Sequence, residues 1–144
     1  MTLNNLVGKT LETITTDKNA IRRLISAAER NIADSKISAV SPENRFDAAY
    51  KAIMQIANAA LQAKGYRTLT SKPEHHQTMI QSLSKTLGIE NDTIILLDAM
   101  RKQRNIADYS GDIIPESTVK DCIFQAEKLL QNFNNWLATK TGES

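Results

Sequence analysis

The sequence predicts an all-α fold, an up-and-down bundle of five or six helices with short connections. Glycine and proline are scarce, at 5 and 3 of 144 residues, whereas residues that favour helix, such as alanine, leucine and lysine, are abundant. Apolar residues recur along the chain at intervals of three and four. No stretch alternates cleanly between apolar and polar residues, so no strand is expected.

Composition is typical of one folded domain, with 41% apolar and 24% charged residues. We expect a single unit over 1–144, made of an N-terminal helical hairpin (1–40) and a core bundle (41–139). The lone Cys122 excludes an internal disulfide. Adjacent His75 and His76 cannot share one helix face, so no metal site is expected. We expect no cofactor either.

The apolar runs and the charge of the sequence indicate where in the cell the protein is expected. No apolar run approaches the roughly 18 residues of a membrane span, and the N-terminus lacks the basic and apolar segments of a signal peptide. These features predict a cytoplasmic protein with no membrane contact. A net charge of +2 permits contact with nucleic acid without requiring it.

Each expected helix has start or stop signals. Asp17 and Ser41 precede helices as N-caps, Pro42 suits a first helical position, and Gly65 and Gly88 follow helix ends. Ser71 and Glu74 resemble a capping box within a loop over 66–73. The expected helices cover 2–14, 18–37, 42–64, 73–87, 91–109 and 115–139, with a turn at 110–112.

The fifth of these helices ends in an unusually polar stretch. Between Asp98 and Asp112 it carries three cations and three carboxylates in fifteen residues. If the last four helices alternate in direction, the cation-rich segment 64–76 lies at the same pole as Arg104. That pole would then suit a phosphate-bearing ligand.

The run Arg104-Asn105-Ile106-Ala107-Asp108-Tyr109, late in a helix, resembles the signature of the HEPN superfamily. The ordered blocks 45–52, 60–67 and 97–105, with His75-His76 between the last two, resemble a bacterial branch of that superfamily. The resemblance implies a helical bundle that dimerises so that two motifs face one cleft. It also implies a metal-independent endoribonuclease of toxin–antitoxin or defence systems, in which Arg binds phosphate and His moves the proton.

The chain departs from that signature where the family has His. Four residues separate Arg104 from Tyr109, and six separate Arg101 from Asp108. A Tyr titrates near pH 10 and is a poor base at neutral pH. We therefore expect an RNA-binding, nucleotide-binding or protein-interaction module without catalysis, a homodimer with a possible antitoxin-type partner. The alternative is an endoribonuclease using Arg104 with Tyr109, Asp108, or His75 or His76.

The candidate residues have two readings. As a site, Arg104 and Tyr109 would be the catalytic pair. The binding residues would be Arg67, His75, His76, Arg101, Arg104, Asn105 and Asp108. As a structural network, Asp98–Arg101, Arg101–Asn105 and Arg104–Asp108 have the spacings of pairs along one helix, and Tyr109 packs its ring against a neighbour.

Overall fold

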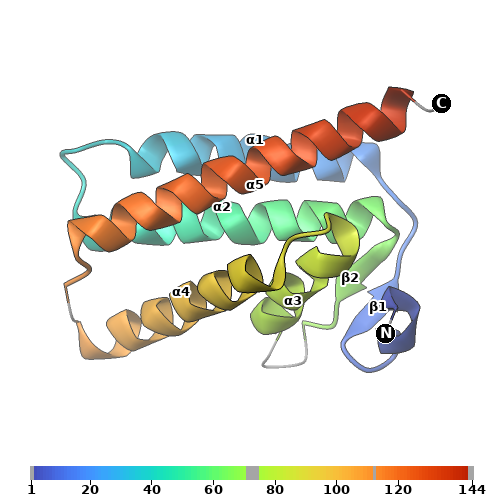
Figure 1. Cartoon of the computed structure of the whole chain (residues 1–144), viewed down its shortest axis with the longest axis horizontal. Coiled ribbons are helices and arrows are strands. Elements are labelled where there is room, and N and C mark those ends of the chain that lie inside the picture. The colour runs from blue at the N-terminus through green and yellow to red at the C-terminus, as the bar shows by residue number, and fades with distance from the viewer. Residues whose placement is uncertain (1, 71–74, 112, 143–144) are drawn as a thin grey trace.

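Five α-helices form a bundle in the computed structural model, which describes residues 2–70, 75–111 and 113–142, apart from the side chains of 109 and 140–142 (Figure 1). The elements are η1 (Leu3–Leu6), β1 (Leu11–Thr13), α1 (Lys18–Ser35), α2 (Pro42–Ala63), β2 (Tyr66–Thr68), α3 (His75–Thr86), α4 (Asn91–Ser110) and α5 (Glu116–Gly142). The all-α bundle expected from the sequence is confirmed. Within the described ranges no helix is both long and apolar enough to span a bilayer.

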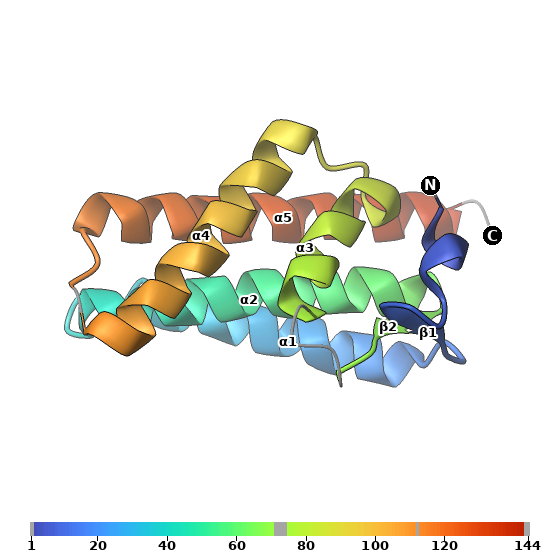
Figure 2. The same ribbon diagram turned by 90° about the horizontal axis from the view of Figure 1, so that it is seen from below.

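Helix α2 lies at the centre of the bundle. It packs against all four other helices. Figure 1 shows α1 and α5 along one side of it, and Figure 2 shows α3 and α4 crossing it obliquely on the other. Ala49, Ala57 and Ala60 are fully buried, and their small side chains allow the neighbouring helices to approach closely. The polar residues on the side of α2 that faces α3 and α4 can therefore contact side chains of those two helices.

The expected ends of the first long helices are confirmed by their caps. The Asp17 carboxylate accepts hydrogen bonds from the backbone N–H of Asn19 and Ala20, at 2.9 and 3.3 Å. The Ser41 hydroxyl accepts from the N–H of Asn44 at 3.4 Å. These bonds satisfy N–H groups that a first helical turn leaves without partners.

The prediction of an N-terminal helix over 2–14 is wrong. Only a short 3-10 helix forms, Gly8 takes a φ of +86°, and β1 pairs antiparallel with β2. Gly8 interrupts the helix with a backbone conformation that other residues rarely adopt. Thr10 and Thr13 then favour an extended chain, while Leu11 is fully buried. The N-terminal part is thus no helical hairpin, and the expected loop over 66–73 begins with a strand.

Other helix boundaries follow the sequence closely. The expected helix over 91–109 ends at Ser110, where Gly111 has a φ of +70° and its N–H donates to the Ala107 carbonyl. Gly88, with a φ of +67°, follows the end of α3. The capping box at Ser71 and Glu74 lies outside the described residues.

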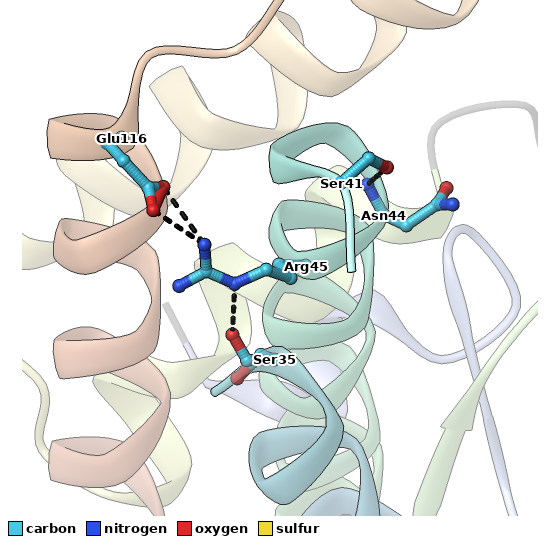
Figure 3. A network of polar contacts seen from close by, with 5 residues as sticks. All are labelled: Ser35, Ser41, Asn44, Arg45 and Glu116. Carbon is cyan, nitrogen blue, oxygen red and sulfur yellow. Dashed lines mark hydrogen bonds and ion pairs between the residues drawn. The ribbon is translucent and has the colours of Figure 1, made fainter. Parts of the chain in front are cut away.

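Arg45 joins three helices, as Figure 3 shows. Its Nε donates to the carbonyl of Ser35 at the end of α1, at 2.8 Å. Its Nη1 donates to both carboxylate oxygens of Glu116 at the start of α5, at 2.6 and 3.0 Å. The Arg45 residue is only 8% exposed, so this charge is buried, while about half of the Glu116 side chain remains exposed. We refer to Ser35, Arg45 and Glu116 as the Arg45 clamp.

The expected pole of cations is only partly formed. Arg104 contacts Asp47, early in α2, whereas Lys64 follows the far end of that helix. Arg67 pairs with Glu12 across the small sheet. The reason is that α3 begins beside Tyr50 and not beside Lys64, about 21 Å further along α2. The alternation of directions therefore brings α4 back to the first half of α2.

Candidate functional site

The polar half of α4 meets α2 at Arg104. The Arg104 Nε donates to the Asp47 Oδ1 at 2.7 Å, and the two side chains are 28% and 38% exposed. The Lys51 ammonium lies 4.0 Å from the other oxygen of Asp47, one helical turn further along α2. One carboxylate thus serves as counterion for two cations from two helices.

Tyr50 lies beneath this group. The Arg104 Cζ is 5.3 Å from the centroid of the Tyr50 ring, a cation–π geometry. Tyr50 is 2% exposed. Burial raises the pKa of its hydroxyl to about 12, despite the opposing charges of Arg104 and Arg101. The hydroxyl therefore stays protonated at neutral pH.

His76 brings a third helix to the same place. Its Nδ1 lies 3.4 Å from the Tyr50 hydroxyl, and the His75 ring packs edge-on at 4.5 Å between centroids. Burial lowers the pKa of His76, and the neighbouring His75, Arg104 and Arg101 lower it further. His76 is therefore a neutral imidazole at neutral pH, able to accept a proton.

These side chains line a groove of about 250 Å³, which we name the Arg104 groove. Met54 and Met79 form its apolar part. Its polar residues are Asp47, Tyr50, Lys51, Gln55 and Asn58 of α2, His76 of α3 and Arg104 of α4. The α2 residues extend over three turns, about 16 Å. A smaller hollow of about 90 Å³ lies where Arg104 and Asp47 meet Asp108 and Gly111.

The charge of Arg104 is fixed by its neighbours. Partial burial alone would lower the pKa of its guanidinium. The hydrogen bond and charge of Asp47, with the charge of Asp108, outweigh burial and raise that pKa. Arg104 is thus a permanent cation, partly exposed and held in place by a carboxylate.

A second ion-pair network lies one turn earlier on α4. The Arg101 Nε donates to Asp98 at 2.8 Å, and the Lys102 ammonium lies 3.5 Å from the same carboxylate. The hydrogen bond from Arg101 lowers the pKa of Asp98, against the effect of burial. This arrangement confirms the structural reading of the Asp98–Arg101 spacing.

The structure brings together some of the expected site residues. Arg104 and His76 both line the groove, as required by an endoribonuclease in which one of the two histidines acts with Arg104. Asp108 lines the smaller hollow beside Arg104. Asn105 is exposed and lines neither of the two hollows.

Arg67 was expected at the site and is not there, because its strand is paired at the far end of α2. Arg101 is held by Asp98, and its charge still reaches Tyr50 and His76. His75 packs on His76. Tyr109 lies in the last turn of α4, and its side chain is outside the described part of the chain.

Sequence reasoning missed the contribution of α2. Asp47, Tyr50 and Lys51 were part of a block that carried the family resemblance, but no role was assigned to them. The available signal was the polar edge formed by residues 47, 51, 55 and 58 on a helix otherwise rich in buried alanine. Those positions recur at helical spacing, so they share one face.

Other parts of the described structure have fewer groups that could bind a ligand or a metal ion. Among the described residues, no group of three or more His, Cys, Asp and Glu side chains could hold a metal ion. A groove of about 310 Å³ between the start of α4 and α5 has Leu97 and Leu129 in its lining, with Glu90 and Lys128 as its charged residues. These opposite charges cancel, so this second groove has no preference for an anion.

The arrangement at the Arg104 groove can bind an anion and can position a neutral imidazole beside it. Both abilities come from residues of three helices. Comparison with protein-family models and with curated proteins finds no match for this chain.

Proposed function

We propose that this protein is a HEPN-like module that binds RNA or a nucleotide through the Arg104 groove, without catalysis. The observation that carries the proposal is the convergence of Arg104, Lys51 and His76, from three helices, on one open groove. A guanidinium and an ammonium are the usual protein partners of phosphate oxygens. The neutral imidazole and the nearby amides supply hydrogen bonds for the remainder of such a ligand.

Two amides extend the groove away from the cations. Gln55 accepts a hydrogen bond from Asn31 through Oε1, and Asn58 accepts one from Gln62 through Oδ1. In each case the bond engages the amide oxygen, which fixes the orientation of the side chain. Amide side chains of this kind can bond to the edges of bases. The groove thus supports a ligand with a phosphate at one end and a polar ring at the other.

The proposal is tested by titrating the full chain with a short fluorescent single-stranded RNA and following anisotropy. Arg104→Gln should weaken binding at least tenfold, and wild-type affinity should fall with added salt because phosphate contacts release counterions. The matched control is Arg67→Gln, which removes the same charge from an exposed ion pair away from the groove. Equal binding by the Arg104 variant and the wild type would exclude the groove as the site.

A metal-independent endoribonuclease is the second candidate, and the position of His76 favours it. A neutral His76 beside Arg104 could take a proton from a ribose hydroxyl while Arg104 stabilises phosphate charge. Cleavage of single-stranded RNA should then persist in EDTA and be lost in both Arg104→Ala and His76→Ala. If no cleavage occurs across varied RNAs, the enzyme reading fails and the binding reading stands.

We further propose a homodimer formed through the outer face of α4. Ile95 and Ile106 are each 60% exposed there, and they share one helix face because eleven residues make about three turns. Leu96, next to Ile95 in the sequence, is 39% exposed. Exposed apolar side chains on one helix face favour association. Light scattering should report a dimer mass for the wild type and for Ile37→Glu, an exposed isoleucine elsewhere, but a monomer for Ile106→Glu. A monomer mass for the wild type at every concentration would contradict the proposal.

The link to toxin–antitoxin or defence systems and an antitoxin-type protein partner rest on the resemblance carried by Arg104-Asn105 and its flanking blocks. Co-purification from the native host tests them together. A stable partner protein recovered with the wild type and lost with Ile106→Glu would support an antitoxin-type role.

A further inference from the structure

We infer that the Arg104 groove selects a phosphate monoester, in a mononucleotide or at a phosphate-bearing RNA end, over the phosphodiesters within a strand. This inference rests on the proposed function and adds the class of ligand. It follows from the place of Asp47, which no reading of the sequence had assigned to the site.

Asp47 already occupies the position of an anion. One of its oxygens accepts from the Arg104 Nε at 2.7 Å, and the other lies 4.0 Å from the Lys51 ammonium. Both cations of the groove therefore have an internal counterion. An incoming phosphate must share these cations with Asp47 or displace it.

The outcome of this competition depends on charge. A phosphodiester carries one negative charge, the same as the carboxylate it would replace, so the exchange gains little. A monoester carries between 1.5 and 2 negative charges at pH 7, because its second pKa is near 6. Only the monoester brings more charge to Arg104 and Lys51 than Asp47 already supplies.

The other polar groups of the groove do not alter this count. Tyr50 is protonated, and Gln55 and Asn58 are neutral amides. Arg101 and Asp108 lie near the groove but outside its lining. Arg101 has its own carboxylate, Asp98, at 2.8 Å, and the charge of Asp108 acts on Arg104 from the smaller hollow. With Asp47 displaced, Arg104 and Lys51 present two positive charges in the groove, which suits a ligand that carries nearly two negative charges.

The test compares two versions of one short fluorescent RNA, ending either in a 5′-phosphate or in a 5′-hydroxyl, at pH 7.5. An extra charge within about 4 Å of two cations should make wild-type binding of the phosphate-ended RNA roughly tenfold tighter. Competition with adenosine and guanosine monophosphates separates the sources. Displacement at similar concentrations identifies a mononucleotide as a sufficient ligand, and its absence identifies the RNA end.

Asp47→Asn provides the decisive variant. Removing the internal anion should tighten binding of both RNAs severalfold, because neither ligand then competes with the Asp47 carboxylate for Arg104 and Lys51. Asp47 is partly exposed, and circular dichroism would verify that the variant is folded. The control is Glu127→Gln, which makes the same charge change at the exposed pair with Lys36 on another face; it should leave both affinities unchanged.

The results distinguish failure of the monoester selectivity from failure of the proposed RNA or nucleotide binding. Equal affinity of the wild type for both RNAs would overturn the monoester selectivity while leaving RNA binding at Arg104 intact. The same conclusion follows if Asp47→Asn and Glu127→Gln behave alike. Failure of the wild type to bind either RNA or either mononucleotide would overturn the proposed function together with this inference.

Discussion

Two arginines join α2 to other helices, Arg45 from α2 itself and Arg104 from α4, and their surroundings differ. Arg45 is 8% exposed and bonds to the backbone of α1 and to Glu116 of α5. The Arg104 side chain is 28% exposed, pairs with Asp47 and lines two hollows. The same side chain thus acts as a buried clamp at one site and as an accessible cation at the other. The difference lies in how much of each guanidinium the neighbouring helices cover.

The clamp should carry the larger share of stability. Arg45→Met removes hydrogen bonds that join three helices and leaves the Ser35 carbonyl without this partner. We expect unfolding in urea to show a loss of about 2 kcal/mol, in the range for bonds to charged groups. Because half of the Glu116 side chain is exposed, water can solvate it, and the loss stays below that of a fully buried pair. A loss below about 0.5 kcal/mol would show that the clamp is an incidental contact.

Substitution of Arg104 should reduce RNA affinity strongly and the free energy of unfolding only slightly. Arg104→Gln removes a partly exposed ion pair, so we expect at most about 1 kcal/mol of lost unfolding free energy. Its loss of RNA affinity should nevertheless reach tenfold, or about 1.4 kcal/mol. Urea unfolding and anisotropy on the same preparation measure both quantities. A variant that unfolds as readily as Arg45→Met would place Arg104 with the structural residues.

The groove should also respond to pH through His76. Its pKa is lowered in the folded state, so the unfolded chain binds more protons just below its ordinary pKa of 6.5. The free energy of unfolding should therefore fall as the pH drops below about 6.5 and level off below the folded pKa. His76→Gln should flatten this slope, whereas Arg45→Met should keep it. An NMR titration in which His76 titrates at or above 6.5 would contradict this account.

The smallest change in the free energy of unfolding is expected at the ion pair between Arg67 and Glu12. Glu12→Gln removes an ion pair with Arg67 whose side chains are 38% and 60% exposed. Exposed pairs contribute about 0.2–1 kcal/mol, and salt weakens them further. Thermal unfolding at low and high salt would detect the change, and RNA binding should be unaltered. A clear loss of RNA affinity would extend the binding surface to the small sheet.

The sequence by itself determined the helices of the bundle and most of their ends. Caps such as Asp17 and Ser41 act within one turn, and apolar spacing acts along one helix, so both can be read locally. The same local reasoning failed for residues 2–14. Their apolar spacing fits a helix, but the pairing partner of β1 lies more than fifty residues away in β2.

Tertiary structure alone decided the composition of the site. Arg104 and the histidines were identified from the sequence, and the spacing of Asp98 and Arg101 predicted their ion pair. The partner of Arg104 could not be read in that way, because Asp47 precedes it by 57 positions and meets it only where α4 crosses α2. That crossing depends on where α3 begins, and side-chain packing between helices fixes that point. Local spacing thus specified which residues carry charge, and helix packing specified which charges meet.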